Sequence, residues 1–124
     1  MEQIRIQRNE LVLAGRAERA GSFWLRAKGL LGRKQLLEGE ALILERCKSV
    51  HMFFMRFPID VVFCNEANEV VRICSELHPW RISPYVAKAD YVVELPAATA
   101  AVKELQVGDR LLFRPSSAVS SAHT

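Results

Sequence analysis

The sequence predicts a mainly β, single-domain fold, either an antiparallel β-sandwich or a barrel-like sheet, with two short peripheral helices. Segments with strand-like hydrophobic patterns recur along the chain, about seven in all. Turn-forming residues separate neighbouring segments, which suits antiparallel pairing. The length of 124 residues is enough for one buried core.

The N-terminal part is expected to contain two strands and a helix. Residues 3–7 alternate polar and apolar side chains, as a half-buried strand does, and residues 11–13 form a possible second strand. The small and polar residues 14–21 predict a connection. A helix is predicted over residues 22–32, because a serine precedes apolar side chains at helical spacing and a glycine follows them.

The rest of the chain carries the remaining strands and the second helix. Strands are predicted over 40–45, 50–57, 59–64, 70–77, 91–95 and 110–114, and a short helix over 97–105. Segment 50–57 is apolar on both faces, which predicts a central strand covered on both sides and interrupted by Pro58. The domain is expected to span residues 1–115. The small, polar residues 116–124 predict a disordered tail.

The composition is that of an ordinary globular protein with a formal net charge of +3. Its lysines and arginines are scattered, which does not favour a nucleic-acid partner. The sequence shows neither the pattern of a signal peptide nor an apolar run of the ~18 residues that span a membrane. We therefore expect a cytoplasmic protein without membrane contact.

Three cysteines, Cys47, Cys64 and Cys74, suggest neither a disulfide framework nor a zinc site, because their number is odd and no two have the close spacing of zinc ligands. Cys64 and Cys74 lie in apolar runs and are expected to be buried.

Several short motifs occur in a specific order over most of the chain. They lie at 29–33, 39–43, 51–63, 70–71, 79–81, 92–97 and 107–109. The ordered set resembles domain of unknown function family 192, a group of small bacterial and archaeal proteins. The resemblance implies a compact, mainly β fold and no established activity. The chain departs from the family at Met52, where a threonine is common, and at Ala98, where a glycine is usual, so a backbone geometry that only glycine adopts is not expected at Ala98.

The apolar segment 50–63 also holds three ionisable residues, His51, Arg56 and Asp60. A buried charge must be paired, hydrogen-bonded or functional, because an unpaired one is costly. One interpretation of Asp60 is a structural carboxylate that accepts backbone N–H bonds or pairs with Arg33, Arg56 or Arg81. The other is a carboxylate that lines a pocket.

His51 and Glu94 have similar alternatives. His51 is either a core or rim histidine, or it converges with Asp60 and Glu94 into a set of one nitrogen and two oxygens suited to a divalent metal. No histidine spacing typical of metal sites supports this set. Glu94 belongs either to a solvated strand face or to an ion pair with Arg33 or Arg81.

The Pro79-Trp80-Arg81 loop offers an aromatic ring beside a guanidinium. Such a pair can anchor a protein partner or a planar ligand. Alternatively, the loop folds over the core and Trp80 fills a gap there.

No familiar catalytic or phosphate-binding motif occurs. The sequence therefore favours a binding or accessory module whose pocket takes a small polar ligand or a protein terminus. Its candidate ligand-binding residues are Arg33, His51, Asp60, Trp80, Arg81 and Glu94. The alternatives are a metal- or carboxylate-dependent enzyme that uses His51 and Asp60, and an interaction module that docks through residues 79–81. The sequence identifies no cofactor and no oligomeric state.

Overall fold

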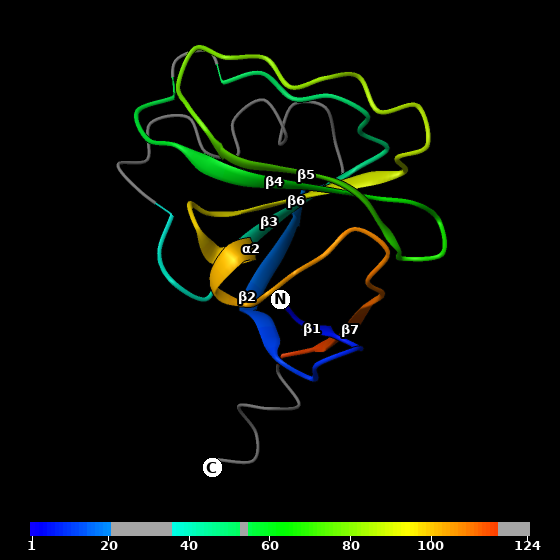
Figure 1. Ribbon diagram of the computed structural model, residues 1–124. Helices are drawn as coiled ribbons and strands as arrows, with labels where there is room; N and C mark the ends of the chain where they lie inside the picture. Colours follow the sequence, from blue (N-terminus) through cyan, green and yellow to red (C-terminus); the bar gives the residue numbers. More distant parts are fainter. Residues whose placement is uncertain (21–35, 53–54, 117–124) are drawn as a thin grey trace.

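The computed structural model describes residues 1–20, 36–52 and 55–116, and these are mainly β, as predicted. The predicted helix over 22–32 lies outside the described residues, as does the predicted tail apart from Ser116. The elements are β1 (Glu2–Ile6), β2 (Val12–Ala20), β3 (Glu40–Glu45), β4 (Ile59–Cys64), β5 (Val70–Leu77), β6 (Tyr91–Pro96), α2 (Thr99–Val102) and β7 (Leu111–Pro115) (Figure 1).

One seven-stranded sheet contains all of these strands, in the order β5-β4-β6-β3-β2-β1-β7. All neighbouring strands pair antiparallel except β2 and β3, which pair in parallel from Arg16↔Glu40 to Ala20↔Leu44. The prediction of a wholly antiparallel sheet is therefore wrong at this pair. A parallel pair requires a long crossover connection, and residues 21–39 provide one.

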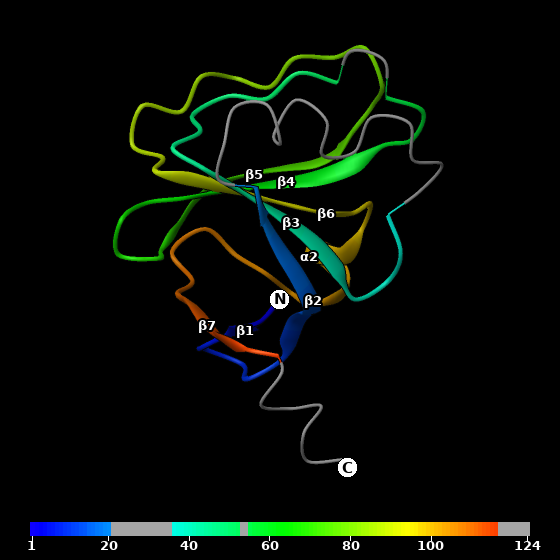
Figure 2. The same ribbon diagram turned by 180° about the vertical axis from the view of Figure 1, so that it is seen from behind.

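The sheet curls into a half-barrel, in agreement with the barrel-like alternative of the prediction, and the sandwich is not confirmed (Figures 1 and 2). Main-chain bonds bring the start of β5 to the turn that precedes β7. The Val70 amide donates to the Asp109 carbonyl at 2.8 Å, the Gly108 amide to the Val70 carbonyl at 2.8 Å, and the Leu111 amide to the Asn68 carbonyl at 2.9 Å. These bonds hold the two edge strands close together at one end of the sheet.

Two apolar clusters cover the two faces of the sheet. The interior cluster lies inside the curl, and the outer cluster lies between the sheet and the loops above it in Figure 1. All six residues of β4 are buried because both of its faces are covered. The interior cluster includes Ile4, Ile6, Leu13, Ile43, Val62, Val93, Leu95 and Leu111, and the outer cluster includes Leu42, Val50, Met52, Met55, Ile59, Val61, Phe63 and Val92.

Two of the strand predictions are wrong. Residues 14–20 continue β2 instead of forming a connection, since Ala14 and Ala17 pack into the interior cluster. The described part of segment 50–57 forms no strand apart from one isolated bridge, His51↔Ile82. Its apolar residues cover the outer face of the sheet as a loop, and a covering loop can have the same apolar pattern as a central strand.

The second predicted helix, over 97–105, is present only as the four-residue α2. The predicted hairpin of β4 and β5 is confirmed. In the part of the chain that the structure describes, no helix is both long and apolar enough to span a membrane.

Candidate functional site

Asp60 is fully buried on β4 and its carboxylate accepts three main-chain hydrogen bonds. Oδ1 accepts from the amides of Glu76 at 2.9 Å and Ala98 at 3.1 Å, and Oδ2 accepts from the amide of Ala100 at 2.8 Å. Bonds of this kind to a carboxylate are stronger than neutral ones. The carboxylate therefore ties the end of β5 and the segment before α2 to the centre of the sheet, in agreement with the structural interpretation of Asp60.

Both residues that donate to Oδ1 have a left-handed backbone, with φ of 51° at Glu76 and 73° at Ala98. This conformation costs a residue with a side chain roughly 1–2 kcal/mol. The expectation that Ala98 avoids such a geometry is therefore wrong. The tertiary contact with Asp60 holds Ala98 in a conformation that its own side chain disfavours.

Glu94 is buried in β6, where its neighbours across the sheet are Leu42 and Val61. Both neighbours belong to the outer cluster, so the carboxyl lies on that face. Its carboxyl forms no hydrogen bond or ion pair with the described residues. Burial raises the pKa of Glu94 from 4.5 to about 7. Glu94 is buried rather than on a solvated strand face, and it forms no ion pair with Arg81; Arg33, the other predicted partner, lies outside the described residues.

Asp60 and Glu94 lie on opposite faces of the sheet. The direct neighbour of Asp60 on β6 is Leu95, a residue of the interior cluster, whereas Glu94 faces the outer cluster. His51 lies in the loop layer and is exposed. The three residues of the proposed metal set therefore do not converge. Among the residues that the structure describes, no group of three or more His, Cys, Asp or Glu side chains could hold a metal ion.

Trp80 does not fill a gap in the core, because 59% of its surface is exposed. Its amide donates to the Met52 carbonyl at 2.7 Å, and the Met52 amide donates to the Arg81 carbonyl at 2.7 Å. Arg81 is also exposed, while Arg33 lies outside the described residues. The loop thus presents its aromatic ring and its guanidinium to solvent.

The cysteines agree in part with expectation. Cys64 is fully buried, and burial raises the pKa of its thiol to about 12. Cys74 is only partly buried. A thiol that stays protonated is a poor nucleophile, so Cys64 is a packing residue.

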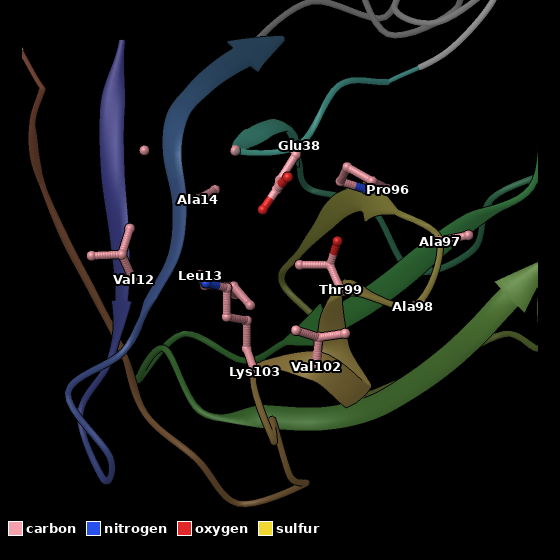
Figure 3. Close-up of a pocket in the computed structure, with 12 residues that line it drawn as sticks. Val12, Leu13, Ala14, Glu38, Pro96, Ala97, Ala98, Thr99, Val102 and Lys103 are labelled. Atoms are coloured by element: carbon pink, nitrogen blue, oxygen red, sulfur yellow. The ribbon is translucent and has the colours of Figure 1, made fainter.

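A cleft of about 460 Å³ opens between β2, the turn before β3 and the segment around α2. Figure 3 shows β2 on one side and residues 96–99 on the other. Its lining is mainly apolar and small: Val12, Leu13, Ala14, Gly15, Gly39, Pro96, Ala97, Ala98 and Val102, with Glu38, Thr99 and Lys103 as the polar members.

The two charged residues of the cleft have opposite signs and lie at opposite ends. Glu38 lies near Pro96 with its carboxylate directed into the open space, and Lys103 extends from the end of α2 with its amino group beside Leu13 (Figure 3). Neither side chain forms an ion pair with a described residue. The cleft can therefore offer one anionic and one cationic group to a ligand, with an apolar wall between them.

None of the described candidate residues, His51, Asp60, Trp80, Arg81 and Glu94, lines this cleft. Asp60 acts on it indirectly, because two of its three donors, Ala98 and Ala100, belong to the wall segment around α2. The sequence does not identify β2 as a wall of the cleft, because the small and polar residues 14–21 predict a connection. The available signal was the small side chains Ala14 and Gly15 in one segment and Ala97 and Ala98 in another, which leave space when the segments meet.

Comparisons with known proteins agree on one family. The model of the family described as "Uncharacterized ACR", domain of unknown function family 192, matches residues 4–113. A UPF0127 protein of Thermococcus sibiricus is 33% identical over 106 residues, which are 81% of this chain and 67% of that protein. A UPF0127 protein of Pyrococcus abyssi is 37% identical over 105 residues, 78% of this chain and 85% of that protein.

A solved structure shares the fold. It is a protein of unknown function from Novosphingobium aromaticivorans, with a TM-score of 0.78 and 23% sequence identity, covering 90% of this chain and 82% of that one. At this identity the likeness concerns the fold alone.

Proposed function

We propose that this chain, which belongs to domain of unknown function family 192, acts as a binding module, and that the cleft between β2 and α2 is its ligand site. The cleft carries the proposal. Its volume of about 460 Å³ falls within the range of small-molecule sites, which are mostly apolar with a few polar groups. Glu38, Thr99 and Lys103 would orient the ligand.

The hydrogen bonds that hold the cleft wall in place support this proposal. A binding site is more selective when its walls are held in place before the ligand arrives. Two of the three bonds of the Asp60 carboxylate, from the amides of Ala98 and Ala100, hold the wall segment around α2 in this way. In this role Asp60 is a positioning residue that does not touch the ligand.

The metal- or carboxylate-dependent enzyme has less support. The Asp60 carboxylate is buried and already accepts three hydrogen bonds, whereas His51 is exposed in the loop layer. A general base must reach the proton that it removes. His51 and Asp60 lie in different layers of the molecule, so together they do not meet this requirement.

A fragment screen followed by NMR of the ¹⁵N-labelled protein tests the binding module. We expect the hits to shift amides of β2 and of residues 96–103. Val102→Trp should remove this binding, because Val102 lines the cleft and 73% of its surface is exposed. Val107→Trp is the matched control, since Val107 is 63% exposed and lies outside the cleft. Hits that shift only other regions, or that bind the Val102→Trp variant unchanged, would contradict the proposal.

A second candidate function is protein interaction through the loop that contains Trp80. The observation that favours it is a group of exposed apolar side chains, Trp80 at 59%, Ile82 at 61% and Tyr85 at 71% exposure. Exposed apolar groups of this kind often mark contact sites. Trp80→Ala should then leave the thermal midpoint nearly unchanged and remove the partner from a pull-down. A variant that still retains its partners would argue against this surface.

A further inference from the structure

We propose that the ligand of the cleft is an extended peptide segment, which adds as a strand to the open edge of β2 and places a cationic group near Glu38 and an anionic group near Lys103. This inference rests on the proposed function, since it takes the cleft as the ligand site, and it adds the chemical class of the ligand. Three independent features of the cleft support it.

The first feature is an unpaired strand edge. β2 pairs with β1 through Ile4↔Ala14 and Arg5↔Val12, but its pairing with β3 begins only at Arg16↔Glu40. On the side of β3, therefore, no described strand pairs with residues 12–15. An unpaired edge presents main-chain donors and acceptors and is a template for another strand.

The second feature is the way in which β2 borders the cleft. Four consecutive residues, 12–15, line it. A strand face would contribute every second residue, because side chains alternate across a strand, so four in a row indicate that the edge borders the space. A Cβ atom built on Gly15 or Gly39 would meet no heavy atom within 4 Å. These two glycines therefore leave open space beside the strand.

The third feature is charge. Glu38 and Lys103 lie at opposite ends of the cleft and form no ion pair with described residues. A peptide with one basic and one acidic side chain, or with free termini, complements both. Leu13 and Val102 also line the cleft and can contact an apolar side chain of the peptide. A compact small molecule would satisfy the charges without using the strand edge.

The test uses two capped hexapeptides, acetyl-Lys-Thr-Val-Thr-Val-Glu-amide and its charge-reversed form, acetyl-Glu-Thr-Val-Thr-Val-Lys-amide. Each is titrated into the ¹⁵N-labelled full chain. We expect one of the two to shift the amides of residues 12–15 and to slow their hydrogen exchange. Two further versions of this peptide carry methyl groups on alternate main-chain nitrogens, one on the odd positions and one on the even positions. One version should lose binding and the other should keep it, because only every second amide faces the pairing edge.

Charge variants assign the orientation. Lys103→Glu should weaken binding of the preferred peptide about tenfold, whereas Lys88→Glu, at an exposed position outside the cleft, should leave it unchanged. The double variant Glu38→Lys with Lys103→Glu should prefer the opposite peptide. This exchange of preference cannot result from misfolding.

The outcomes separate the inference from the proposed function. Fragment hits in the cleft without binding of either peptide would overturn the inference and leave the proposed function standing. If neither fragments nor peptides bind in the cleft, the inference and the proposed function are both overturned. Equal binding of the two methylation patterns would overturn strand addition. Protection of residues 12–15 by self-association, seen as a dimer in sedimentation, would also overturn the inference, because the occupant would then be a second copy of the chain.

Discussion

Two carboxyl groups buried at the centre of the sheet, Asp60 and Glu94, differ in how the fold satisfies them. They lie on neighbouring strands, where Asp60 faces Leu95 and Glu94 faces Val61. Asp60 accepts three main-chain hydrogen bonds on the interior face, whereas Glu94 lies on the outer face without a hydrogen-bonding partner among the described residues. Burial alone therefore does not decide how much a carboxyl group contributes to stability. The contribution depends on the hydrogen-bond donors around it.

The difference has a structural origin. The donors to Asp60 come from the end of β5, from Ala98 before α2 and from Ala100 in the first turn of α2, where the chain leaves regular strand geometry and its amides are not committed to the sheet. The described neighbours of Glu94 are strand residues, Leu42 and Val61, whose main chains are engaged in pairing. Irregular backbone thus stabilises one carboxylate, whereas the regular strand pairing of the described residues offers no free amide to the other.

The largest effect is expected from removal of the Asp60 carboxylate. Asp60→Ala leaves three amides without their acceptor, the buried amide of Ala100 and the partly buried amides of Glu76 and Ala98, and an unsatisfied buried group costs roughly 1–3 kcal/mol. We expect the free energy of unfolding to fall by about 4 kcal/mol in urea titrations. Asp60→Asn keeps one acceptor oxygen and should lose about 2 kcal/mol.

An exposed loop carboxylate is the control for this experiment. Glu66→Ala should change the stability by no more than about 0.5 kcal/mol. A loss below about 1 kcal/mol in Asp60→Ala would show that the three hydrogen bonds are not what distinguishes Asp60 from Glu94.

The next effect is a pH dependence caused by Glu94. Because the folded pKa, about 7, lies above the unfolded value of 4.5, the folded state binds more protons between these values. The contribution of Glu94 to stability is therefore complete below about pH 4.5 and is lost as the pH rises to about 7. The shift corresponds to about 3 kcal/mol.

Urea titrations between pH 5 and pH 8 measure this loss. In Glu94→Gln the free energy of unfolding should decline less steeply with rising pH. At pH 8 the variant should be more stable than the wild type, because an amide is less costly to bury than a carboxylate. Glu66→Gln serves as the control and should keep the decline of the wild type. An unchanged decline in Glu94→Gln would assign the pH dependence to another group.

The smallest effect concerns Ala98, which donates to Asp60 with a φ of 73°. Ala98→Gly should raise the free energy of unfolding by about 1 kcal/mol, because glycine adopts this conformation without a steric cost. Ala97→Gly, next to it and without a positive φ, should be neutral or destabilising. A destabilised Ala98→Gly variant would mean that the Asp60 contact does not hold the residue in a strained conformation.

Sequence analysis could identify strands and the buried character of Asp60, but not the cleft. Residues 59–64 and 70–77 were recognised as a hairpin because their patterns and the loop between them are local. Segment 50–57 was mistaken for a strand, since a loop that covers a sheet is as apolar as a central strand. The cleft was missed because Glu38 and Lys103 are distant in sequence, and nothing local signals that they line one space.

The sequence by itself determined the mainly β class, the family and most strand positions, because hydrophobic periodicity and turn residues act over a few neighbouring positions. Only the tertiary structure decided the parallel pairing of β2 with β3, the curl of the sheet and the opposite environments of Asp60 and Glu94. These depend on which distant main-chain groups meet a given side chain. The tertiary structure decides whether a buried carboxylate is hydrogen-bonded, because the fold determines which donors come within reach of it.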